Sequence, residues 1–170
     1  AVRPTGRTLA RVLVSPDRVI RQVAGLRPFR RSGFNVSVAK IGDKPVIHNY
    51  GHGGGGITLS WGTAQLVVEH AVATPHRDAA VMGCGAVGLA TARRFAQEGA
   101  RTMLTDINLD AVAAAAKTLL AEGHEVAFLH HDVASPSDWD RVIEATSSRW
   151  QHLDVLVNNA GITRDASLKK

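Results

Sequence analysis

The chain has 170 residues, of which 45% are hydrophobic and 21% are charged. This length and composition are ordinary for a soluble globular protein with one domain, or with one and a half small ones. A single cysteine excludes intrachain disulfides and any site that needs two thiolates. No apolar run reaches the length of a membrane span, and the N-terminus lacks the apolar core of a secretory signal, so we expect a cytoplasmic protein without a membrane partner.

The net charge of +5 is concentrated in the first part of the chain. Residues 1–76 carry ten lysines and arginines against three acids, whereas residues 77–170 carry ten against twelve. A basic arm is one signature of nucleic-acid binding. These arginines, however, are scattered among Gly, Pro and strand-like residues, with no helical stripe and few aromatic neighbours. We expect no nucleic-acid partner, because an anionic cofactor or a carboxylate substrate accounts for the charge at least as well.

Taken in chain order, the first elements form a small antiparallel sheet. Short strands are predicted at residues 10–14, 19–23, 34–41 and 45–50, each bounded by turn residues. This arm, residues 1–76, is predicted to be a domain separate from residues 77–170.

A glycine-rich loop follows at residues 51–56, with the sequence GHGGGG. A helix is predicted after it, capped by Thr58 or Ser60 and ending near Ala73. Five glycines in six positions cost chain entropy, and this is offset where backbone must approach a ligand closely. A glycine loop that leads into a helix N-terminus is also an anion site. A mobile surface loop is the alternative, but the strand before it and the helix after it favour a fixed geometry.

The next stretch, residues 81–106, organises the chain. A short buried strand is followed by a G-x-G-x-x-G turn, a helix over residues 87–97, a second strand over residues 101–105, and then Asp106. This order and spacing are typical of a dinucleotide-binding βαβ unit, in which the acid accepts hydrogen bonds from the adenosine ribose. A carboxylate there repels a 2′-phosphate, so Asp106 favours NAD over NADP.

The remaining sequence continues the α/β alternation. Helices are predicted over residues 109–122, capped by Asn108, and from Ser135-Pro136 to residue 150. Strands are predicted over residues 125–129 and 153–157. We therefore expect an α/β fold: a Rossmann-type half-sheet of strand order 3-2-1-4, preceded by the small β-rich arm with its glycine-rich loop and helix. The fourth strand presents an open edge, which predicts self-association.

Residues 46–64, VIHNYGHGGGGITLSWGTA, resemble the signature of the D-amino-acid oxidase family of FAD-dependent oxidoreductases. The segments GLRP, at residues 25–28, and GCGAVGLATAR, in the glycine turn, are also similar to that family. The resemblance implies that FAD is the cofactor and that Arg27 binds a substrate carboxylate. It also implies that the glycine-rich loop contacts the flavin through Gly53, Gly54, Gly55, Gly56, Ile57 and Thr58.

From about Phe95 onward the sequence resembles the first half of short-chain dehydrogenases, most of all the 3-oxoacyl and acetoacetyl-CoA reductase branch. The resemblance implies that Asp106 binds the adenosine ribose, that Asp132 and Val133 contact adenine, and that the NNAG segment lines the cofactor. Two features depart from the family. The glycine spacing differs, and the catalytic Ser, Tyr and Lys that follow the fourth strand are missing.

The chain thus resembles a hybrid of two oxidoreductase families, and both need a dinucleotide at the glycine turn. We expect a dinucleotide-binding oxidoreductase-like protein that uses FAD or NAD for hydride transfer on a small-molecule substrate. The alternative is a catalytically incompetent hybrid or fragment that at most binds nucleotide. No metal site is expected, and Cys84 is interpreted as a small residue in a tight turn. Besides the glycine-rich loop, the expected cofactor-binding residues are Gly83, Gly85, Ala86, Val87, Gly88, Asp106, Asp132, Val133, Asn158, Asn159, Ala160 and Gly161.

Overall fold

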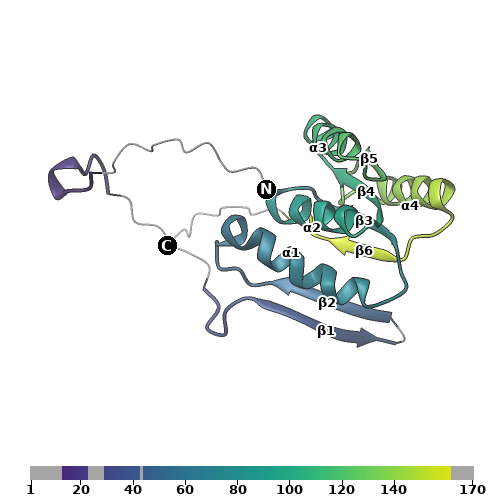
Figure 1. Ribbon diagram of the computed structural model, residues 1–170, viewed down its shortest axis with the longest axis horizontal. Coiled ribbons are helices and arrows are strands. Elements are labelled where there is room, and N and C mark those ends of the chain that lie inside the picture. Colours follow the sequence, from purple (N-terminus) through teal and green to yellow (C-terminus); the bar gives the residue numbers. More distant parts are fainter. Residues whose placement is uncertain (1–12, 23–28, 43, 162–170) are drawn as a thin grey trace, which may run out of the picture.

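The computed structural model describes residues 13–22, 29–42 and 44–161. It contains two sheets, an antiparallel hairpin of β1 and β2 and a parallel sheet of strand order β5-β4-β3-β6 (Figure 1). The elements are η1 (Pro16–Arg18), β1 (Asn35–Ile41), β2 (Lys44–Tyr50), α1 (Gly56–Val72), β3 (Asp78–Met82), α2 (Ala86–Gln97), β4 (Arg101–Asp106), α3 (Leu109–Ala121), β5 (Val126–His130), α4 (Pro136–Trp150) and β6 (Val155–Asn158). The predicted α/β fold with a 3-2-1-4 half-sheet after a β-rich arm is confirmed.

The parallel sheet is covered by helices on both faces. All five residues of β3 are buried, as expected for a central strand that has no solvent-facing side. On one face Val81 and Leu104 pack with Ala92 of α2 and Val112 of α3. On the other face a separate cluster joins the sheet to α4, through Met82, Met103, Val142 and Trp150 among others. All four strands are parallel, so their carboxyl ends meet at one edge.

The N-terminal arm packs against this sheet through α1. In Figure 1 helices α1 and α2 lie side by side, and the hairpin covers the outer side of α1. Val68 and Ala71 of α1 share a buried cluster with Ala79 of β3 and Phe95 of α2, and Ile47 of β2 packs against it. The arm and the Rossmann half therefore share one hydrophobic core, whereas the predicted division into two domains at residues 76/77 stays a prediction.

Two local predictions are wrong. The strand predicted at residues 19–23 is absent from its described part, residues 19–22; among the described residues before β1, η1 is the only helix or strand. Neither Thr58 nor Ser60 caps α1, which begins earlier, after Gly55 and without a side-chain cap. Ser60 instead donates its hydroxyl to the Ile57 carbonyl within the helix (2.8 Å). Of the strand predicted at residues 10–14, residues 10–12 lie outside the described residues.

The described helices include none that is long and apolar enough to cross a membrane.

Strand β6 lies at one edge of the parallel sheet. Among the described strands it pairs with β3 alone, so its other edge is free of backbone partners.

Candidate functional site

The glycine turn after β3 is the centre of the candidate site. Gly83 has φ of +87°, a left-handed conformation that L side chains rarely adopt. A Cβ at Gly88 would overlap the Gly83 carbonyl oxygen, so the helix and the strand come together only with glycine at this position. A Cβ at Gly85, in contrast, would meet nothing within 4 Å, so the backbone at the start of α2 faces open space. An open helix N-terminus of this kind is chemically suited to an anion such as a pyrophosphate.

The loop after β6 closes over one side of this turn. The Asn159 side-chain amide donates to the Gly83 carbonyl (2.9 Å), and the backbone N–H groups of Asn159 and Ala160 both donate to the Met82 carbonyl (2.9 and 2.7 Å). A Cβ at Gly83 would lie 2.5 Å from the Ala160 backbone. Asn158 ends β6 beside Met82, and Gly161 is exposed. The structure thus brings Asn159 and Ala160 to the glycine turn, although their predicted contact with a cofactor stays a prediction.

Asp106 lies at the same edge of the sheet, at the end of β4. Its Oδ2 accepts the Cys84 backbone N–H (2.7 Å), and its Oδ1 accepts the Asn108 backbone N–H (2.9 Å). The side chain is therefore held beside the glycine turn in one orientation. Each carboxylate oxygen has two lone pairs, so each keeps one for a further donor such as a ribose hydroxyl.

Cys84 occupies the variable position of the turn without being reactive. Burial raises the pKa of its thiol to about 12, and the neighbouring Asp106 carboxylate adds to this shift. The thiol is therefore protonated at neutral pH and acts as a small, half-buried group. What matters at this position is its backbone N–H, which the sequence does not single out.

Asp132 and Val133 form the next loop along the same edge, after β5. The adjacent His131 donates its backbone N–H to the Asp106 carbonyl (3.0 Å), so this loop is tied directly to the end of β4. The first turn of α4 holds the loop from the other side, because Asp138 and Trp139 both hydrogen-bond its backbone (2.9 Å each). Sequence reasoning identifies Asp138 only as part of a helix start and misses Trp139, because no local pattern marks an indole that bonds six residues back.

The glycine-rich loop of the arm lies beside the Rossmann turn. Gly53 and Gly54 have φ of +56° and +77°, and the Gly55 N–H donates to the His52 carbonyl (2.9 Å), so the loop is a tight, defined turn. A Cβ at Gly56 would contact Val87 at 3.5 Å. Helices α1 and α2 therefore begin side by side. Ile57 and Thr58 are exposed on the first turn of α1, and the predicted Arg27 lies outside the described residues.

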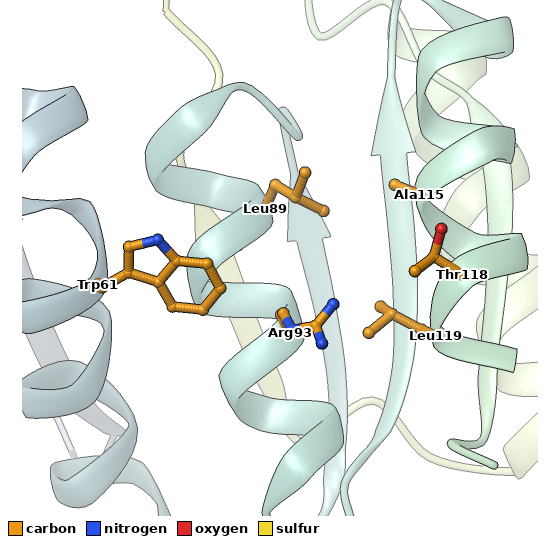
Figure 2. Close-up of a pocket in the computed structure, with 6 residues that line it drawn as sticks. All are labelled: Trp61, Leu89, Arg93, Ala115, Thr118 and Leu119. Carbon is orange, nitrogen blue, oxygen red and sulfur yellow. The ribbon is translucent and has the colours of Figure 1, made fainter. Parts of the chain in front are cut away.

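A separate pocket of about 360 Å³ lies between helices α1, α2 and α3. Figure 2 shows its lining, which comprises Trp61, Leu89, Arg93, Ala115, Thr118 and Leu119. No predicted cofactor residue is among them. Arg93, the charged group of the lining, is already paired with Glu122 through two contacts of 2.8 Å. Within the described ranges, no three His, Cys, Asp or Glu residues are grouped as a metal site requires.

Two family models match this chain. Residues 78–170 match the one described as short chain dehydrogenase, and residues 2–70 match the one described as FAD dependent oxidoreductase. Both resemblances seen in the sequence are confirmed. The first match begins at residue 78 and so includes the glycine turn.

Curated relatives match about half of the chain. An uncharacterized oxidoreductase of Mycobacterium bovis is 47% identical over 88 residues, covering 51% of this chain and 35% of the relative. The 3-beta-hydroxysteroid dehydrogenase of Comamonas testosteroni is 43% identical over 81 residues, covering 47% of this chain and 30% of the relative. The chain therefore spans about a third of the length of these relatives. A solved metagenomic short-chain oxidoreductase in complex with NADP is 29% identical, with a TM-score of 0.48, and the match covers 51% of this chain and 39% of that one.

Proposed function

The chain belongs to the short chain dehydrogenase family, and from this premise we propose that it binds NAD at the carboxyl edge of the parallel sheet as the cofactor-binding part of an oxidoreductase. The observation that carries the proposal is the Asp106 carboxylate, fixed beside the glycine turn by the Cys84 and Asn108 backbone. Bound NAD supplies a hydride acceptor for oxidation of a small-molecule substrate.

The residues present fit an adenosine diphosphate moiety. The open backbone at Gly85 and the N-terminus of α2 suit the pyrophosphate, since unsatisfied N–H groups and the helix dipole both favour an anion there. The free lone pairs of Asp106 accept ribose hydroxyls. We assign the adenine to Asp132 and Val133, because their loop follows β5, the strand that pairs with β4 and so ends beside Asp106. The preference for NAD over NADP follows from repulsion between Asp106 and a 2′-phosphate.

FAD is the second candidate, and one observation favours it. Gly56, the first residue of α1, lies close to Val87 in the first turn of α2, so the two helices begin side by side. A dinucleotide whose pyrophosphate rests on α2 then has the second glycine loop within reach of its other end. The match of residues 2–70 to FAD dependent oxidoreductases agrees with this arrangement. In this reading Gly53 to Thr58 contact the flavin, and Arg27 binds the substrate carboxylate.

Titration of the purified chain tests the proposal. Binding of NAD, NADP and FAD is measured separately by calorimetry, with the visible spectrum recorded for bound flavin. NAD is expected to bind more tightly than NADP; saturation by FAD alone would favour the second candidate, and no binding of any of the three would refute both. Turnover with added alcohol substrates separates an active protein from one that only binds nucleotide. The free edge of β6 further predicts self-association, which sedimentation of the same sample measures.

Replacement of Asp106 by Ala then tests the placement of the ribose. Loss of hydrogen bonds to a charged group is expected to weaken NAD about tenfold or more, and to reduce the preference over NADP. Asp110→Ala is the matched control, because Asp110 is an exposed acid in the first turn of α3. Equal effects of the two replacements would refute the role given to Asp106.

A further inference from the structure

The loop between β5 and α4 is hydrogen-bonded at most of its backbone groups. The Asp132 N–H donates to Asp138 Oδ2 (2.9 Å), and the Asp132 carbonyl accepts the Ser135 N–H (2.9 Å). The first peptide of the loop is thereby fixed by a side chain of α4, and the second by the turn that begins the helix.

The third peptide of the loop is fixed from both sides. The Val133 carbonyl accepts the indole N–H of Trp139 (2.9 Å), and the Ala134 N–H donates to Asp132 Oδ1 (2.9 Å). Among the polar groups of Asp132 and Val133, only the Val133 N–H and Asp132 Oδ2 have no hydrogen-bond partner in the part of the chain that the structure describes.

One donor beside one acceptor is the complement of the adenine Watson–Crick edge, where N1 accepts and the 6-amino group donates. Hypoxanthine presents the reverse, a protonated N1 and a 6-oxo group. A loop that offers the Val133 N–H and the Asp132 carboxylate together therefore selects adenine over hypoxanthine, provided that the two groups are held in register. That register is set by the hydrogen bonds on the peptides around them.

We infer that Trp139 and Asp138 are positioning residues for adenine recognition: they hold the Asp132-Val133 loop so that its free donor and acceptor face the base together. The inference rests on the proposed function, since it assigns determinants of base specificity within that same dinucleotide site. Neither side chain contacts the base itself. Each acts through one backbone group, Trp139 through the Val133 carbonyl and Asp138 through the Asp132 N–H.

Trp139 is itself held in place from the sheet. Its ring meets the His131 imidazole edge to face, with centroids 4.7 Å apart and planes at 89°. His131 Nδ1 in turn is 3.1 Å from the hydroxyl of Thr105, the residue before Asp106. The Asp132-Val133 loop is thus linked to the end of β4 that carries Asp106. Asp138 is similarly braced, by Arg141 (3.1 Å) and His130 (3.4 Å).

The test compares two ligands that differ only in the base, NAD and nicotinamide hypoxanthine dinucleotide. Trp139→Phe keeps an aromatic ring beside His131 but removes the indole donor to Val133. Trp150→Phe is the matched control: Trp150 lies on the same helix and donates its indole N–H to Glu125 Oε1 (2.9 Å), at the opposite edge of the sheet. Dissociation constants for both ligands and the thermal midpoint are measured for each protein.

Trp139→Phe is expected to weaken NAD about five- to tenfold, the effect of one hydrogen bond, with a much smaller change for the hypoxanthine analogue. The preference for NAD, which is the dissociation constant of the hypoxanthine analogue divided by that of NAD, therefore falls. Trp150→Phe leaves this ratio unchanged. Asp138→Ala provides a second route to the same loss, and Asp138→Asn, whose side-chain oxygen still accepts the Asp132 N–H, retains most of the ratio.

Two results overturn the inference in different ways. If NAD binds and the ratio stays the same in Trp139→Phe and Asp138→Ala, the two side chains support folding only and the inference alone fails. If neither ligand binds the unsubstituted chain, the proposed function fails and the inference fails with it.

Discussion

Replacement of Gly88 by Ala is expected to unfold this protein at a much lower temperature. The added Cβ would overlap the Gly83 carbonyl oxygen and lie 2.6 Å from the Asn159 side-chain nitrogen. Both neighbours are fixed, since Asn159 donates to that same carbonyl (2.9 Å). The helix must therefore move away from the strand, or the loop after β6 must be displaced.

The magnitude follows from these two contacts. Overpacking of a filled core costs about 1–3 kcal/mol, and the broken Asn159–Gly83 hydrogen bond adds about 1 kcal/mol. For a chain of this size each kcal/mol lowers the unfolding midpoint by about 2–4 °C. Gly88→Ala is therefore expected to lower the midpoint by roughly 10 °C, measured by circular dichroism during heating.

Gly62→Ala is the matched control for this experiment. Gly62 lies inside α1, has no positive φ, and a Cβ there would meet nothing within 4 Å. The same substitution is expected to stabilise the protein by about 0.5–1 kcal/mol, because alanine loses less chain entropy in a helix. A midpoint for Gly88→Ala within 2 °C of the unsubstituted chain would refute the close approach of α2 to the glycine turn.

Two further predictions concern charge. Burial holds the pKa of His131 below its ordinary value of 6.5, with the Asp138 carboxylate acting in the opposite direction, so the folded chain takes up this proton less readily than the unfolded chain. The stability that the neutral imidazole contributes is complete above the pKa of the unfolded chain and is lost as pH falls below it. Urea unfolding at pH 7.5 and 5.5 measures this decrease in the free energy of unfolding. His131→Leu should make the free energy of unfolding depend less on pH. Arg101 binds the buried Asp78 through two hydrogen bonds (2.6 and 2.7 Å) at the opposite edge of the sheet. Arg101→Ala should lower the free energy of unfolding, because it leaves that carboxylate without its partner. Arg101→Lys keeps the charge and should lower it less. Unchanged stability of Arg101→Ala in urea would contradict this, and NAD affinity should not change in either variant.

The sequence predicts helix ends correctly where a capping side chain lies within or next to the helix. Asn108 accepts the Ala111 N–H (3.0 Å) and caps α3 as expected, and Ser135 with Pro136 begins α4. The start of α1 was misplaced because its cap, Gly55, contributes no side chain. The strand expected at residues 19–23 is not observed for another reason: a strand requires a partner, and residues 19–22 pair with no other residue that the structure describes.

The candidate site was predictable where spacing alone sets the geometry. The glycine pattern and the distance to Asp106 place the acid beside the turn, and the structure brings them together through the Cys84 N–H. The contacts of Asn159 with Gly83 and of Trp139 with Val133 were not predictable. The first joins residues 76 positions apart, and the second depends on the direction in which α4 leaves the sheet.

The core shared by α1 and the parallel sheet has a consequence for modularity. The two family matches meet between residues 70 and 78, which suggests a natural point at which to divide the gene. Val68 and Ala71 on one side of that point are buried against Ala79 and Phe95 on the other. Cutting there would expose apolar surface on both fragments. The two segments, which match different family models, thus share a buried surface, and replacing either one requires redesigning the surface that the other one buries.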